Sequence, residues 1–231
     1  MKVKLVKEGR RRKISQGILE SIISSVSSML TPKWKKGETP LKRKKKFDVP
    51  QAWMNGIIKR QLVSAGFKTE VDPFSEERPA SIEKRLSVTK KELKKQAIDF
   101  EKNCSKGKRH IVEVECGNVA SLYRSIHKIC MAIREKNGAV GIIVVPNKKL
   151  IGRCDTASAM SSSESAKVIL SEYAYYYPEA NEINLIEFST DQEVNIAELN
   201  DDTNYWKGKL TKPKEKYLDD NLNRFLKPIT E

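Results

Sequence analysis

Residues 110–145, HIVEVECGNVASLYRSIHKICMAIREKNGAVGIIVV, determine the fold that we predict. Alternating apolar and polar side chains over His110–Cys116 are typical of a strand with two different faces. Apolar residues then recur at helical spacing from Val119 to Lys136, and the apolar run Ala139–Val145 indicates a buried strand. This stretch therefore predicts a strand, a helix and a second strand in succession, which is a unit of an α/β protein.

Further predicted elements lie on both sides of this unit. They are helices at Ile14–Leu30, Val49–Gly66, Thr89–Gln96, Ser161–Tyr177 and Glu215–Phe225, and strands at Ala97–Phe100 and Glu182–Phe188. The order of the elements from Ala97 onward predicts an α/β fold with a central mixed β-sheet flanked by helices. We expect one domain over residues 1–190 and a lysine-rich C-terminal extension over residues 191–231.

The net charge of +14 favours a polyanionic partner. The chain has 44 Lys and Arg residues against 30 Asp and Glu residues. A basic arm is predicted at about residues 33–48, where five consecutive cations could contact DNA phosphates: Lys42, Arg43, Lys44, Lys45 and Lys46. A solvated surface segment is the alternative for the arm, and a basic soluble or ribosome-associated protein is the alternative for the whole chain.

The cysteines and the N-terminal residues bear on the cellular compartment. Cys104, Cys116, Cys130 and Cys154 include no CxxC pair, so a structural zinc site is not expected. Residues 1–13 lack the apolar core of a signal peptide, and no apolar run is long enough to cross a bilayer. A protein of the reducing cytoplasm without membrane contact is therefore expected.

A pair of glutamates in the first strand of the central unit suggests metal-dependent chemistry. Glu113 and Glu115 lie two residues apart, so a strand sends both side chains to one face. A hairpin would bring Asp99 beside Glu113 and complete a three-carboxylate site suited to Mg²⁺, which could assist phosphodiester hydrolysis. The alternative is that both glutamates line the solvent face of an amphipathic edge strand.

The sequence around these glutamates resembles a known enzyme family. Residues 112–128, VEVECGNVASLYRSIHK, are similar to the catalytic strand and following helix of the BamHI family of type II restriction endonucleases. Weaker similarity extends over about residues 15–155, and it includes Ala97–Phe100 and Glu77-Arg78-Pro79. The resemblance implies a restriction-endonuclease-like core within the wider PD-(D/E)xK nuclease superfamily.

The resemblance also implies roles for the four acidic residues. Asp99 and Glu113 would be the metal ligands, and Glu115 would be the general base, at a position where many nucleases of this superfamily have lysine. Glu77 would be a supporting acidic residue, with an ordinary surface charge as its alternative.

Residues that match base-reading positions of the family are DNA-binding candidates. Asn118 and Arg124 can form paired hydrogen bonds to purine edges, although a helix cap and a surface ion pair are the alternatives. Ser121 lies between them, whereas Ala120 stands where the family has serine. The Asp-Arg pair of the family falls near Asp155, with Arg153 close by, so sequence specificity could differ.

The implied function is Mg²⁺-dependent hydrolysis of double-stranded DNA at a short palindromic site, for which the resemblance admits a GATC centre. The implied partners are a second copy of the chain, forming a homodimer, and a cognate methyltransferase. Two other functions remain open: a structure-specific DNA repair nuclease of the same fold, and a non-enzymatic basic DNA-binding protein.

Overall fold

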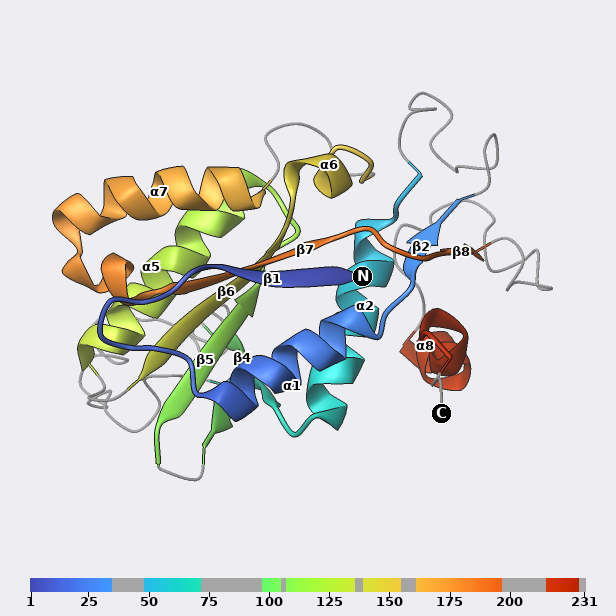
Figure 1. Cartoon of the computed structure of the whole chain (residues 1–231), viewed down its shortest axis with the longest axis horizontal. Helices are drawn as coiled ribbons and strands as arrows, with labels where there is room; N and C mark the ends of the chain where they lie inside the picture. The colour runs from blue at the N-terminus through green and yellow to red at the C-terminus, as the bar shows by residue number, and fades with distance from the viewer. Residues whose placement is uncertain are drawn as a thin grey trace, which may run out of the picture.

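The computed structural model describes residues 1–34, 48–71, 97–104, 107–135, 139–154, 161–196 and 215–228. Within these residues, a six-stranded sheet has the order β1-β7-β6-β5-β4-β3 (Figure 1). The strands are β1 (Lys2–Lys7), β3 (Lys68–Val71), β4 (Ile98–Asn103), β5 (Arg109–Val114), β6 (Val140–Pro146) and β7 (Asn184–Ser189). β5, β6 and β7 are parallel, while β1, β3 and β4 pair antiparallel with their neighbours. The predicted central mixed sheet is confirmed.

Helices cover both faces of the sheet (Figure 1). α1 (Gln16–Ser27) and α2 (Gln51–Ser64) pack on the face to which Val112 and Ile142 point, in one core cluster. α5 (Val119–Glu135) and α7 (Ser163–Tyr176) pack on the face of Ile111 and Ile143, in a second cluster. Because side chains alternate along each strand, the central strands supply both clusters.

The strands β1 and β3 were not predicted, and β4 is longer than expected. The charged and apolar residues of Lys2–Lys7 alternate, and this segment pairs with β7, almost the whole chain away. The prediction ended β4 at Phe100, but Glu101 and Lys102 continue it opposite Ile111 and His110. Backbone hydrogen bonds to β5 stabilise these polar residues in a strand, although polar residues on their own have little preference for strands.

A second sheet, of two strands, lies beside α2. β2 (Thr31–Lys33) pairs in parallel with β8 (Glu193–Asn195), and the short helix α6 (Lys148–Ile151) follows β6. Helix α8 (Glu215–Asn221) and the 3₁₀ helix η4 (Leu222–Phe225) occupy the predicted C-terminal helix. The ring of buried Phe225 lies 5.3 Å from that of Trp53 in α2, so these C-terminal residues contact the core.

The remaining helices match the sequence predictions with small shifts at their ends. Gly66 has φ +84°, a conformation that favours glycine, two residues after α2 ends. A further 3₁₀ helix, η1 (Pro178–Glu182), links α7 to β7. The predicted helix Thr89–Gln96 lies outside the described residues. In the part of the chain that is described, no helix has both the length and the apolar character needed to cross a membrane.

Candidate active site

Two neighbouring antiparallel strands bring the predicted carboxylates together. Phe100 of β4 pairs with Val112 of β5. Because the strands are antiparallel, the residue before Phe100, Asp99, lies across from the residue after Val112, Glu113. The Asp99 amide lies 3.3 Å from Glu113 Oε1, and the Val114 amide donates to Asp99 Oδ2 at 3.0 Å. The sequence therefore predicted correctly that the hairpin places Asp99 beside Glu113.

Ser125 of α5 connects the two glutamates. Its Oγ lies 3.0 Å from Glu113 Oε2 and 3.0 Å from Glu115 Oε2. Since a hydroxyl has one proton, Ser125 donates to one carboxylate at a time or shares its hydrogen between them. Both glutamates thus lie on the face of β5 that α5 covers, and Glu113 is 2% exposed. This burial contradicts the alternative of a solvent-exposed edge strand.

Lys128 is the buried cation of the site. Its Nζ lies 2.6 Å from Glu113 Oε1 and donates to the carbonyl of Ala97 at 2.9 Å. Ser125 and Lys128 are three residues apart, so they share one face of α5. Sequence reasoning assigned neither residue a role. The signal that could have found them is a serine and a lysine among the apolar residues of a helix face that packs on the sheet.

The three carboxyl groups all have raised pKa values. Burial raises the pKa of Glu113 to about 7, and the nearby Asp99 carboxylate raises it too, whereas Lys128 and Ser125 lower it. Burial likewise raises the pKa of Asp99 and of Glu115, and hydrogen bonds from Val114 and Ser125 respectively lower them. These shifts show that burial outweighs the positive charge and hydrogen bonding supplied by the protein.

The described residues contain no group of three Asp, Glu, His or Cys side chains arranged to hold a metal ion. The three-carboxylate metal site expected from the sequence stays a prediction, and in this structure Lys128 Nζ lies 2.6 Å from one oxygen of Glu113. A smaller donor set still fits Mg²⁺, which proteins commonly hold through one or two carboxylates together with water and substrate phosphates. Asp99 and Glu113 could provide such a pair of hard oxygen ligands.

Gly117 allows Glu115 to fold back toward the backbone. The Gly117 amide donates to Glu115 Oε1 at 3.2 Å, and a Cβ atom at this glycine would lie 3.0 Å from the same oxygen. A side chain here would therefore press on the carboxylate. The absence of a side chain at Gly117 thus leaves space for the Glu115 carboxylate.

The candidate base-reading residues lie at the start of α5. Asn118 Oδ1 accepts a hydrogen bond from the Ser121 amide at 2.9 Å, which is the capping arrangement considered as its alternative role. Arg124 is exposed, and its Nη2 lies 3.4 Å from Ser121 Oγ. Base contact by all three residues remains a prediction.

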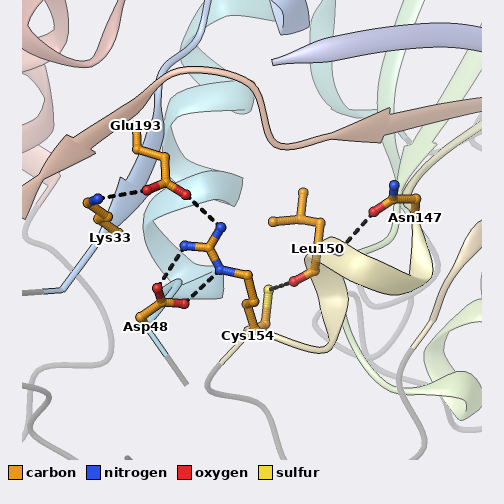
Figure 2. A network of polar contacts seen from close by, with 7 residues as sticks. Lys33, Asp48, Asn147, Leu150, Cys154 and Glu193 are labelled. Atoms are coloured by element: carbon orange, nitrogen blue, oxygen red, sulfur yellow. Dashed lines mark hydrogen bonds and ion pairs between the residues drawn. The ribbon is translucent and has the colours of Figure 1, made fainter. Parts of the chain in front are cut away.

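Arg153 is the centre of an ionic network whose other members, Asp48, Glu193 and Lys33, are labelled in Figure 2. Its Nε and Nη2 bond to the two oxygens of Asp48 at 2.9 and 2.7 Å, and its Nη1 bonds to Glu193 at 2.6 Å. Lys33 lies 2.7 Å from the other oxygen of Glu193. The hydrogen bonds that Arg153 donates to Asp48 raise the pKa of Arg153. All three guanidinium nitrogens are thus engaged within the protein, and DNA contact by Arg153 remains a prediction.

We expect Arg153→Ala to reduce the free energy of unfolding by about 1–3 kcal/mol, because it breaks a network and leaves Asp48 without its paired donors. Urea unfolding followed by circular dichroism measures this loss. Arg153→Lys is the control, since lysine keeps the charge but cannot form the paired bonds. It should recover less than half of the loss, and full recovery would show that charge alone matters.

Glu77, Asp155 and the cations Lys42, Arg43, Lys44, Lys45 and Lys46 lie outside the described residues.

Two comparisons with known proteins each match a restriction endonuclease. A family model described as "Restriction endonuclease BamHI" matches residues 4–154, which is more than half of the chain. Among solved structures, the crystal structure of restriction endonuclease BGLII complexed with a DNA 16-mer is similar, with a TM-score of 0.58 and 17% sequence identity. The match covers 84% of this chain and 79% of that chain, and at this identity it shows the fold alone. A search of curated proteins finds no matching relative.

Proposed function

The chain belongs to the BamHI family of type II restriction endonucleases, and from this premise we propose that it hydrolyses double-stranded DNA at a short palindromic site with Mg²⁺ as cofactor. The observation that carries the proposal is the cluster of buried Glu113 with half-buried Asp99 and Glu115 on adjacent strands. Buried carboxyl groups with insufficient compensation are characteristic of sites that bind a cation or transfer a proton.

Each residue of the cluster has a proposed role. Asp99 and Glu113 hold the cation, which when bound polarises the phosphoryl oxygen and lowers the pKa of water. Glu115 accepts a proton from the attacking water. Ser125 and the Gly117 amide support this role because their hydrogen bonds fix the orientation of the Glu115 carboxylate.

A homodimer follows from the proposed palindromic site, because two-fold symmetry gives each DNA strand its own active site. Large apolar side chains exposed on α5 and α7 support such an association: Tyr123, Val168, Tyr175 and Tyr176. A cognate methyltransferase is proposed as a second partner, since the DNA of a cell with such an enzyme needs protection at the same sites.

Digestion of sequenced plasmid DNA tests the proposal. With Mg²⁺ we expect discrete fragments whose ends map to one short palindrome, and with EDTA we expect none. Cutting confined to junctions, flaps or mismatches would favour a structure-specific repair nuclease. Binding without any cutting would favour a non-enzymatic DNA-binding protein. Mapping the ends also tests the GATC centre, which rests on the match of Asn118 and Arg124 to base-reading positions.

Arg124→Ala should lower kcat/KM at the preferred site by about 5- to 150-fold, because a paired contact to a base contributes about 1–3 kcal/mol of discrimination. Cleavage of sites that differ by one base should fall much less, so that site choice relaxes. Competition between two labelled duplexes measures the ratio. Arg134→Ala removes an arginine from the other end of the same helix and should leave the ratio unchanged. An unaltered ratio in the Arg124 variant would rule out base reading by this residue.

A further inference from the structure

Lys128 is an unusual component of a site proposed to hold a metal cation. Its side chain is 8% exposed, and that of its partner Glu113 is 2% exposed. A buried charge is costly unless it is paired, and here the ammonium offsets part of the cost of burying the carboxylate. The protein therefore supplies a cation of its own at a carboxylate assigned to the metal.

Both oxygens of Glu113 are already engaged. Oε1 contacts Lys128 Nζ at 2.6 Å and the Asp99 amide at 3.3 Å, while Oε2 accepts from Ser125 at 3.0 Å. A divalent ion bound to Glu113 would therefore meet the ammonium at close range. Two positive charges in a poorly solvated site repel each other strongly.

Lysine is suited to leave this contact. Its charge is compact and lies at the end of a flexible four-carbon chain. The second bond of Nζ, to the Ala97 carbonyl at 2.9 Å, is made to backbone just before β4 and does not depend on Glu113. The ammonium thus retains one partner when a cation takes the carboxylate oxygen.

We propose that Lys128 competes with the divalent cation for Glu113 and thereby weakens cation binding to the DNA-free enzyme. Lys128 is a positioning residue in this role: it holds Glu113 in place while no cation is bound. This inference rests on the proposed function, because it takes Glu113 to be a metal ligand.

Calorimetric titration of the full chain with Mg²⁺, without DNA, tests the competition. We expect Lys128→Gln to bind Mg²⁺ about tenfold more tightly than the parent protein, because a neighbouring positive charge is removed. Lys128→Arg keeps the charge and should bind as weakly as the parent. Equal or weaker binding by the Lys128→Gln variant would overturn the competition.

Glu113→Gln separates this inference from the proposed function. It should abolish the Mg²⁺ signal, both alone and combined with Lys128→Gln. If Glu113→Gln bound Mg²⁺ like the parent, the proposed metal site itself would be wrong. If it lost binding while Lys128→Gln gained none, the metal site would stand and the competition would be rejected.

A measurement on the parent protein covers the case in which Lys128→Gln does not fold. Carbon NMR of lysine Cε atoms labelled with ¹³C, with Lys128→Arg used to assign the signal, reports the surroundings of the ammonium. Addition of Mg²⁺ should shift the Lys128 signal selectively as its contact with Glu113 is lost. A signal that stays constant while Mg²⁺ binds would contradict the displacement.

Discussion

Glu113→Ala should reduce the rate of Mg²⁺-dependent DNA cleavage at least about a thousandfold, because metal-assisted stabilisation of the transition state contributes several kcal/mol. The substitution removes a carboxylate assigned to the cation and leaves Lys128 without its buried partner. Binding of the duplex should persist, since the lost charge is negative and DNA is a polyanion. Single-turnover cleavage and a binding titration in EDTA measure the two effects separately.

Glu187→Ala is the matched control for this prediction. Glu187 is also a buried glutamate of the central sheet, but it lies on β7 rather than on β5. Its Oε1 lies 3.0 Å from Lys4 Nζ. Its loss should lower stability but leave single-turnover cleavage by the folded protein within a few-fold of the parent. Comparable losses of cleavage in both variants would mean that the effect comes from disturbing the sheet. A Glu113→Ala enzyme that kept near-normal cleavage would remove Glu113 from the mechanism.

Replacing the five cations of residues 42–46 by glutamine should make DNA binding far less sensitive to salt. Each phosphate contact contributes about 0.9 to the slope of log affinity against log salt concentration, so the slope should become shallower by about four. Between 50 and 200 mM salt this corresponds to a several-hundred-fold smaller loss of affinity, by the same relation. Fluorescence anisotropy with a labelled duplex at four salt concentrations measures the slope.

The control for the arm is a second variant with the same net charge as the arm variant. It replaces by glutamine five exposed lysines elsewhere on the protein: Lys2, Lys4, Lys13, Lys167 and Lys216. If overall charge governs binding, both five-fold variants should change the slope equally. If the arm contacts phosphates, the control should lose much less, and an unchanged slope in the arm variant would refute the contact.

The sequence predicts the framework of the site better than its interior. The alternation around Glu113 and Glu115, with Asp99 on the preceding strand, sufficed because hairpin partners are close in sequence. The roles of Ser125 and Lys128 depend on how α5 rotates against the sheet, which periodicity gives only approximately. The sequence patterns also did not reveal that Lys128 pairs with Glu113 in this site.

Long-range pairing explains the other differences. Arg153 was interpreted from a local resemblance alone, yet its partner Asp48 lies 105 residues away. Strand β1 pairs with β7 near the other end of the chain, so the local alternation of Lys2–Lys7 could not identify its partner. Such pairings follow from the packing of the whole sheet, which no short stretch of sequence specifies.

The network of Arg153 has a practical consequence for engineering. The Trp34 amide donates a hydrogen bond to the Asp48 carbonyl at 2.7 Å. The guanidinium of Arg153 also donates to the side chain of Asp48. These contacts join Trp34, Asp48 and Arg153 from three separate stretches of the chain. An engineered variant that alters any of the three should therefore be checked for stability before its DNA binding is compared with that of the parent.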